Sequence, residues 1–409
     1  MRVFLPFAAG FYLSYLFRTI SALIAVPLTV AFGLTPSRLG LLTSAYFLTF
    51  AVAQLPVGFA LDRYGPRRVQ SILLLLAAGG AALFAASTGF ISLIIGRGLI
   101  GLGVAGSLTA GLKAVILWFP KERIALVNGA MVMVGALGAI TATTPAEWLL
   151  AWIGWRGLFD LLAIITVGSA VIIYLLVPET TKRIAILSDR PSTGLRTIYS
   201  DPRFWRLAPI AAATIGTAWA LQGLWAAPWF NDVEGLGRAG LVHRLLAMAV
   251  ILSLAALLLG IAADRWRRSG IHPQMLFASV AALFIVVQVA LISRRGLPSY
   301  VSWCAVAVVS AGTVLSYAAV AEYFPKELAG RANAALNVFH IGGAFLLQNL
   351  SGIVIQYWPT TNGHYPVIAY QTAFAINVVL QAVALIWFVW PSARLIAKRR
   401  SNWLGAQPA

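Results

Sequence analysis

One arginine lies near the middle of the first apolar segment, at Arg18. Each end of that segment is about fourteen residues away, roughly 20 Å of helix, so the side chain cannot reach water by stretching along the helix. A charge at that depth costs on the order of 2.5 to more than 10 kcal/mol unless it faces water or a partner. Ser14, Arg18 and Ser21 share one helical face. This pattern predicts a guanidinium that binds an anion in a central cavity. The alternative is a structural arginine bonded to backbone or to another helix.

A second group of polar and aromatic residues lies in the apolar segment 205–230. Gln222, Trp225 and Trp229 fall on one helical face there. We expect Gln222 to orient a ligand and Trp225 to stack on it. In the alternative interpretation Trp229 belongs to the membrane interface and Trp219 faces lipid.

A row of polar residues at helical spacing runs along the segment 331–357. Its members are Asn333, Asn337, His340, Gln348 and Ser351. In lipid such a row must face protein or a water-filled path. The row therefore predicts cavity-lining residues, Asn337 and His340 among them, or hydrogen bonds between helices. His340 could also carry a coupling proton near neutral pH.

Two further cations lie inside apolar segments. Arg97 is expected either to act in gating and coupling or to brace the bundle, whereas Lys113 is close enough to a segment end to be structural. The carboxylates Glu147 and Glu322 stand at segment ends, so the sequence places no acid at mid-depth. This weakens a simple carboxylate relay for protons.

No constellation typical of an enzyme is present in the sequence. The four histidines are scattered, Cys304 is the single cysteine, and no glycine-rich phosphate loop with a following lysine occurs. We therefore expect no enzyme activity, no metal and no cofactor.

The composition identifies the elements that must position these residues. Of 409 residues, 60% are hydrophobic and 10% are charged, against about a quarter charged in soluble domains. Long apolar stretches recur throughout, which indicates an all-α polytopic membrane protein. The net charge of +18 does not indicate nucleic-acid binding, because the Lys and Arg stand in short loops and form no continuous basic face.

Twelve apolar segments are long enough to cross a bilayer. They span residues 4–31, 39–61, 69–87, 90–118, 124–144, 156–177, 205–230, 240–262, 273–292, 298–321, 331–357 and 367–390. We expect an N-terminal six-helix bundle at 1–177, a linker at 178–204, a C-terminal six-helix bundle at 205–390 and a basic tail at 391–409. Most of the 30 Lys and Arg fall in loops on the side of the N-terminus. This asymmetry predicts that both termini face the cytoplasm. We expect the protein to lie in the inner membrane of a bacterium.

The two halves repeat each other. Gly58 and Asp62-Arg63 return as Gly260 and Asp264-Arg265, and Trp118-Phe119-Pro120-Lys121-Glu122 returns as Tyr323-Phe324-Pro325-Lys326-Glu327. Repeated bundles with the binding site between them are the usual architecture of secondary transporters.

The chain resembles the major facilitator superfamily over its whole length. The loop motif between helices two and three carries this resemblance, through Gly58, Asp62, Arg63, Gly65, Arg67 and Arg68. The resemblance implies that this motif, with Asp264 and Arg265 in the repeat, forms gating contacts during alternating access. Arg97 belongs to a version of the family's fourth-helix motif.

Within the superfamily the first half looks most like the anion:cation symporter branch. The residues that carry this likeness include Tyr15, Arg18, Ser21 and Pro27 in helix one. Phe17 stands where many members have an acidic residue. The likeness implies transport of organic anions, with the helix-one arginine on the anion.

The sequence thus predicts a monomeric secondary transporter for a small organic anion of the carboxylate or phosphate type, coupled to H⁺ or Na⁺ or working by exchange. The expected substrate-binding residues are Arg18, Tyr15, Ser21, Gln222, Trp225, Asn337 and His340. One alternative is an exporter of hydrophobic, drug-like compounds, which would be expected to carry a deep acidic residue. Another is a membrane sensor that does not transport.

Overall fold

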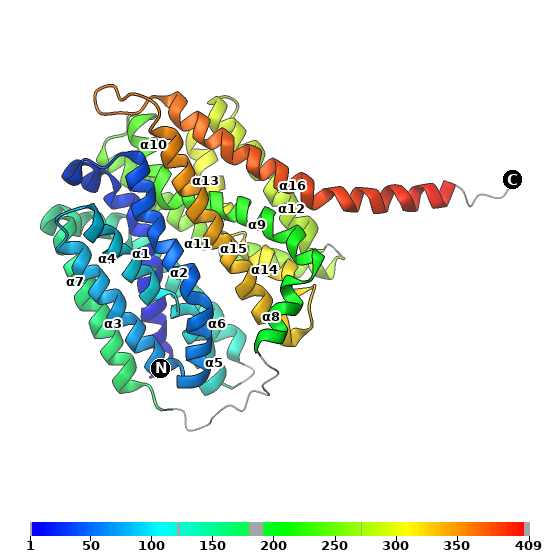
Figure 1. Ribbon diagram of the computed structural model, residues 1–409, viewed down its shortest axis with the longest axis horizontal. Helices are drawn as coiled ribbons and strands as arrows, with labels where there is room; N and C mark the ends of the chain where they lie inside the picture. The colour runs from blue at the N-terminus through cyan, green and yellow to red at the C-terminus, as the bar shows by residue number, and fades with distance from the viewer. Residues whose placement is uncertain (1, 121–122, 180–190, 271, 405–409) are drawn as a thin grey trace.

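The computed structural model describes residues 2–120, 123–179, 191–270 and 272–404, most of them helical (Figure 1). The first bundle contains α1 (Phe4–Phe32), α2 (Pro36–Tyr64), α3 (Pro66–Ala85), α4 (Phe90–Val104), α5 (Ser107–Trp118), α6 (Ile124–Thr141) and α7 (Thr144–Leu176). After α8 (Pro191–Tyr199), the second bundle contains α9 (Pro202–Ala220), the π-helical turn η2 (Leu221–Trp225), α10 (Ala226–Asp232), α11 (Arg238–Arg268), α12 (Pro273–Ser293), α13 (Ser299–Ser310), α14 (Thr313–Ala321), α15 (Lys326–Ile355) and α16 (Val367–Leu404).

The described residues contain ten spans that are long and apolar enough to cross a membrane. The helix α2 adds an eleventh if its two parts, Pro36–Gln54 and Pro56–Tyr64, are taken as one span bent by 49°. A shorter apolar helix, Val127–Thr141, lies within α6. Together these account for all twelve predicted segments and confirm a polytopic α-helical membrane protein. Helices suit the bilayer because they satisfy their backbone hydrogen bonds internally.

Two segments are interrupted at corresponding places in the repeat. The segment 90–118 breaks between α4 and α5 at Ala105-Gly106, and the segment 298–321 breaks between α13 and α14 at Ala311-Gly312. Broken helices at the repeat interface are a usual device for building a site near the midplane of a transporter.

Two boundaries differ from the prediction. The loop expected before residue 156 is helical, because α7 begins at Thr144 and is interrupted only at Gly154, where φ is 67° and ψ is 176°. The final helix does not end at residue 390 but continues to Leu404. Apolar length marks the membrane-crossing part of a helix, whereas polar continuations give no such signal.

The two bundles make most of their mutual contact toward one end of the molecule, the end where α1 finishes. One apolar core there combines Leu23 and Leu28 of α1 with Trp225 and Trp229 of η2 and α10. Separate cores lie within the second bundle and within the first bundle toward the opposite end. Figure 1 shows α10 and the end of α15 beside the first bundle at the top. We call this the closed end.

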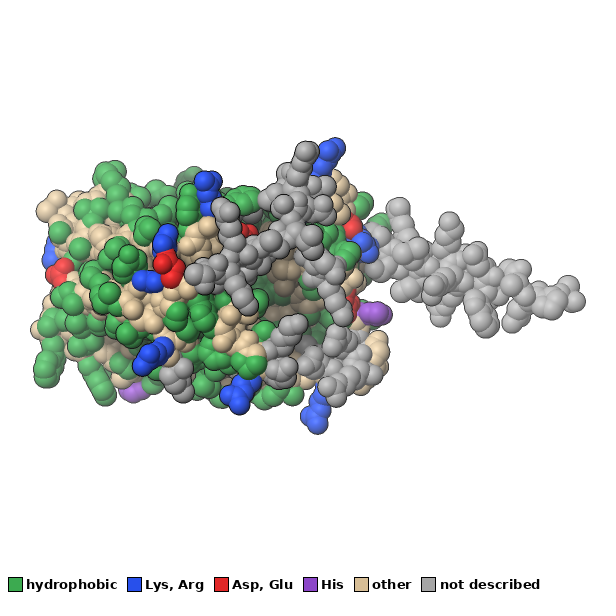
Figure 2. Space-filling view, turned by 90° about the horizontal axis from the view of Figure 1, so that it is seen from below, with side chains coloured by type: hydrophobic (Ala, Val, Ile, Leu, Met, Phe, Trp, Pro, Cys, Tyr) green, Lys and Arg blue, Asp and Glu red, His purple; other side chains and the backbone are tan. Residues whose placement is uncertain are grey.

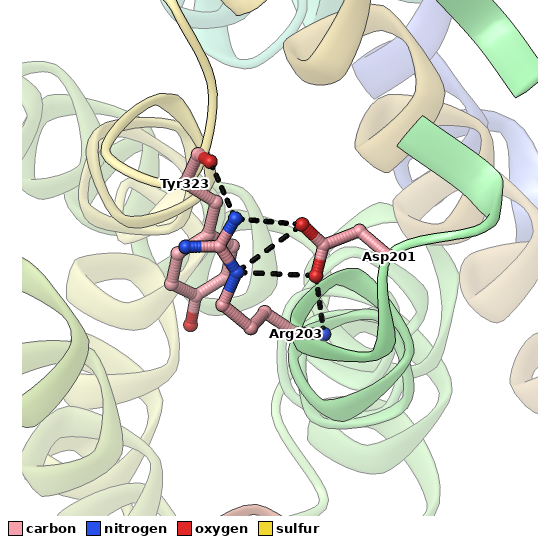
Figure 3. Close-up of polar contacts among 3 residues, drawn as sticks. All are labelled: Asp201, Arg203 and Tyr323. Carbon is pink, nitrogen blue, oxygen red and sulfur yellow. Dashed lines mark hydrogen bonds and ion pairs between the residues drawn. The ribbon is translucent and has the colours of Figure 1, made fainter. Parts of the chain in front are cut away.

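The opposite end, where α1 begins, is the face seen in Figure 2. Lys and Arg side chains are spread over this face, with fewer acidic ones. Asp201 ties part of it together (Figure 3): its carboxylate caps α9 by accepting from Arg203 N at 2.8 Å and also accepts from Arg203 Nη2 at 2.7 Å. Arg203 Nη2 in turn donates to the Tyr323 carbonyl at 2.8 Å. The hydrogen bond from Arg203 lowers the pKa of Asp201 below its usual value, which keeps the carboxylate charged.

Gly103 of α4 marks the closest approach between α4 and α3. A Cβ atom built there would lie 2.7 Å from Ala77 Cα and 2.5 Å from the Leu73 carbonyl. Small residues of this kind let membrane helices pack backbone to backbone.

Gly103→Ala should therefore destabilise the first bundle by about 1–3 kcal/mol, the usual cost of overpacking. The thermal unfolding temperature of the purified protein measures the effect. Gly79→Ala on α3 is the matched control, since nothing lies within 4 Å of its added methyl group. An equal loss of stability in both variants would contradict the packing argument.

Candidate functional site

A cavity of about 130 Å³ lies between the two bundles. It is lined by Phe11, Ser14, Tyr15 and Arg18 of α1, Tyr46, Phe47 and Phe50 of α2, Leu108 of α5, Trp219 of α9, Thr313 and Tyr317 of α14, and Asn337 and Ile341 of α15. Leu108 is the second residue of α5 and Thr313 is the first residue of α14, so both lie close to the two helix breaks. None of these described lining residues is acidic.

Arg18 points its charge into this cavity from between two aromatic rings. Its guanidinium carbon lies 4.2 Å from the centre of the Tyr15 ring and 4.8 Å from that of Trp219. Such cation–π contacts stabilise the charge without using its N–H groups. Arg18 forms no ion pair and no hydrogen bond with the described residues. Its unpaired nitrogen atoms are not among the buried ones, so they remain accessible from the cavity. The guanidinium therefore has donors available for an acceptor in the cavity.

Tyr317 and Asn337 form a polar pair on the wall contributed by the second bundle. The Tyr317 hydroxyl donates to Asn337 Oδ1 at 2.7 Å. This leaves the Asn337 amide hydrogens as donors and the Tyr317 oxygen as an acceptor for other partners. The cavity thus offers a fixed positive charge on one bundle and neutral hydrogen-bonding groups on the other.

Ser21 and Arg97 lie behind the cavity wall. Arg97 is 2% exposed, donates from Nη2 to the Ser21 hydroxyl, and lies with its guanidinium carbon 5.1 Å from the centre of the Tyr46 ring. The Tyr46 hydroxyl donates to the Ser14 carbonyl at 3.3 Å. Arg97 therefore braces α4 against α1 and α2, and Tyr46 separates it from the cavity.

His340 is fully buried one layer behind the cavity. Its Nε2 lies 3.2 Å from the Ser316 hydroxyl, while Nδ1 has no partner among the described residues. Its ring packs against the rings of Trp219 and Tyr317, with centres 6.1 and 5.4 Å apart. His340 thus contacts two cavity-lining residues without lining the cavity itself.

The expected pair Gln222 and Trp225 is not brought together with Arg18. Gln222 lies in η2 outside the residues that line the cavity. Trp225 is 1% exposed at the closed end, where its Nε1 donates to the Gln348 carbonyl at 3.2 Å. Gln348 in turn donates to Thr43 of α2.

The loop motif after α2 is anchored within the first bundle. Asp62 Oδ1 accepts from Lys113 Nζ at 2.5 Å, and the same ammonium donates to the Leu61 carbonyl at 2.8 Å. Gly65 has φ of 80° and joins α2 to α3 without an intervening loop, a conformation that favours glycine. Gly58 has open space around it.

The remaining arginines of the motif also bind groups of the first bundle or of the chain just after it. Arg67 donates to the Tyr174 carbonyl at 2.8 Å, Arg68 pairs with Glu179, and Arg63 lies over the Tyr64 ring.

The repeat of the motif has a different shape. Asp264 and Arg265 are still within α11, and the chain turns only at Gly270, where φ is 80°. Arg265 is exposed, and the side chain of Asp264 lies outside the described part of the structure. The second turn starts later because no glycine follows Asp264 at the place of Gly65.

Sequence reasoning missed most of the aromatic lining of the cavity, including Trp219, Tyr46 and Tyr317. One interpretation of the sequence places Trp219 against lipid, yet its ring lies next to the Arg18 guanidinium and stacks on the Phe47 ring, with centres 6.4 Å apart. The hydropathy of a tryptophan is the same whether its helix face contacts lipid or a cavity, so hydropathy cannot distinguish the two positions. The rotation of α9 against α1 decides this contact, and spacing along one segment does not contain that information.

Comparisons with known proteins agree with this architecture. The sequence profile of the Major Facilitator Superfamily matches residues 7–316. The uncharacterized transporter YybO of Bacillus subtilis (strain 168) is 30% identical over 55% of this chain and 55% of its own length. The probable sulfoacetate transporter SauU of Cupriavidus necator is 25% identical over 39% of this chain and 37% of its own. The chain thus matches about half or less of the length of these relatives.

Among solved structures, a bacterial homolog of the human lysosomal transporter Spinster, in an inward-facing and unoccupied conformation, superposes with a TM-score of 0.79. The two chains are 16% identical in sequence, and the superposed region covers 96% of each chain. At that identity the likeness shows the fold. The profile match, the twelve apolar segments and the central cavity between two repeated bundles lead to one conclusion. This chain belongs to the major facilitator superfamily of membrane transporters.

Proposed function

We propose that the protein is a secondary transporter that moves a small organic anion of the carboxylate or phosphate type across the bacterial inner membrane. The observation that carries this proposal is the free guanidinium of Arg18, held by two aromatic rings in a cavity whose described lining residues include no acid. The name of SauU, which gives sulfoacetate as its substrate, supports an anionic substrate class.

The anion would bind with its acid group on Arg18 and the rest of the molecule against Tyr15, Tyr317 and Asn337. A planar guanidinium can make two parallel hydrogen bonds to one carboxylate or phosphate. Asn337 and Tyr317 would then recognise hydroxyl or carbonyl groups of the substrate. Because Arg18 and Asn337 belong to different bundles, the substrate would contact both moving parts.

Uptake of an anion needs a driving force. A monovalent anion that enters against about 100 mV, negative inside, costs about 2.3 kcal/mol. With no acid among the described residues of the cavity, we propose that the energy comes from exchange for an internal anion or from a co-transported ion. With both termini inside, the closed end faces outward and the substrate would leave toward the cytoplasm.

Arg18→Ala should lower substrate affinity by about 10- to 100-fold, since charge-assisted hydrogen bonds contribute about 1.5–3 kcal/mol. Arg18→Lys should recover only part of this, because an ammonium lacks the planar fork. Uptake of a panel of organic anions into proteoliposomes, with titrations of the purified protein, measures both effects. Arg38→Ala serves as the control, since this exposed arginine lies over Phe90, away from the cavity. Normal transport by Arg18→Ala would disprove the anion site.

We propose that His340 positions the cavity wall and does not carry the coupling proton. It is fully buried, bonded to Ser316 and packed on Trp219 and Tyr317. His340→Gln should therefore respond to a pH gradient as the unmodified protein does, while binding substrate several-fold more weakly. If the variant loses its response to the gradient, His340 belongs to the coupling path and this assignment is wrong.

The Asp62–Lys113 ion pair is proposed to act in the change between states. Asp62→Asn should slow turnover roughly threefold, as expected from losing a partly exposed ion pair worth about 0.2–1 kcal/mol, with little effect on affinity. Lys113→Gln should reproduce the defect, and the double variant should be no slower than either single one. Exchange rates in proteoliposomes measure turnover. Additive defects, or unchanged turnover in Asp62→Asn, would rule out this role.

A further inference from the structure

Pro27 lies inside α1, five residues before its end. Proline has no backbone N–H, so the carbonyl four residues earlier, that of Leu23, loses its helical hydrogen bond. In a membrane such a carbonyl needs a donor from elsewhere in the protein. The donor here is Arg238 of the second bundle, whose Nη2 lies 3.0 Å from the Leu23 oxygen.

The same guanidinium also binds a carboxylate of the first bundle. Arg238 Nε donates to Glu147 Oε1 at 2.7 Å, and Nη2 donates to Glu147 Oε2 at 2.5 Å. This is a bidentate pair, the strongest arginine–carboxylate geometry. Glu147 lies in the first turn of α7, where the helix dipole favours a negative charge. One side chain of α11 thus holds α1 and α7 together.

We propose that Arg238, Glu147 and the Leu23 carbonyl freed by Pro27 form a state-dependent latch that stabilises the closed end. Its two sides come from different bundles, so it can exist only while that end is closed. The contacts of Asp62 and Leu61 with Lys113 differ, because all their partners belong to the first bundle.

The exposure of the charged pair suits a latch that must open. The Arg238 and Glu147 side chains are 33% and 20% exposed, so both can regain water when the bundles separate. Opening therefore avoids leaving a bare charge in lipid, the cost that makes fully buried pairs hard to break. When the bundles separate, the Leu23 carbonyl also loses its hydrogen bond from Arg238. This hydrogen bond therefore adds to the stability of the closed state.

The second bundle supplies a matched proline for comparison. Pro209 lies inside α9 and frees the Trp205 carbonyl, which accepts from Trp387 Nε1 of α16 at 3.4 Å. Donor and acceptor there belong to the same bundle. Removing Pro209 should therefore leave the balance between closed and open states unchanged, whereas removing Pro27 should not.

The test measures distances across the closed end of the full-length protein in lipid nanodiscs by pulsed electron paramagnetic resonance. Spin labels at Trp152→Cys and Tyr357→Cys, in a Cys304→Ser background, report on α7 and on the end of α15. Both sites are strongly exposed, at 90% and 82%. Pro27→Ala and Glu147→Gln should each raise the open-to-closed ratio roughly three- to tenfold, the effect of one or two lost hydrogen bonds. Pro209→Ala should leave it unchanged.

Two further variants protect the test against loss of folding. Arg238→Lys keeps the charge without the bidentate fork and should give an intermediate ratio. Exchanging the charges by Glu147→Arg with Arg238→Glu should restore part of the closed population, because the ion pair returns without the carbonyl contact. A shift in only one of Pro27→Ala and Glu147→Gln, or an equal shift in Pro209→Ala, would overturn the latch. None of these outcomes depends on the identity of the substrate.

Discussion

A bilayer offers no water to unpaired polar groups, and this constraint decides how the helices of this protein are joined. In the second bundle Gln288 and Gln381, each 1% exposed, exchange hydrogen bonds of 3.0 and 3.2 Å between α12 and α16. Gln381 also donates to Thr217 of α9. Apolar surface supplies most of the packing area in such a protein, but it matches lipid on any face. Polar groups therefore specify which helices are neighbours.

Two arginines of the first bundle are accommodated inside the membrane-spanning region in different ways. Arg97 is enclosed by Ser21 and the Tyr46 ring, and it is 2% exposed. Arg18 is held by the faces of Tyr15 and Trp219 and keeps its donors toward the cavity. Arg18 lines the cavity, and none of the described residues that line it is acidic. Arg97 thus adds to the positive potential that an anion would meet, although Tyr46 separates it from the cavity.

The helix α1 connects the proposed binding site with the proposed latch. Arg18 and Leu23 are separated by five residues, about 7.5 Å along a helix. A substrate held by Arg18 and Asn337 would bias the position of α1 relative to the second bundle. The latch responds to the same relative position, because Arg238 reaches the Leu23 carbonyl from that bundle. In this proposal, substrate binding and closure would be coupled through α1 itself, without any long-range pathway.

The sequence by itself determined the spans, the repeat and the family, because each depends on local composition or on residues close together in the chain. Apolar length predicts a membrane helix, and Gly65 at the end of α2 marks a turn wherever the helix is placed. The depth of Arg18 in its segment was equally readable, since depth is a count of residues.

What surrounds Arg18 was decided only by the tertiary structure. Trp219 and Tyr317 reach the cavity through the rotation of their helices, and Trp225, on the face expected to hold ligand, packs instead at the closed end. The partner of Leu23 is 215 residues away at Arg238. Pro27 shows in the sequence that a carbonyl is left free. Only the packing of the two bundles decides which donor satisfies it, because many donors in the chain are chemically equivalent and only geometry distinguishes them.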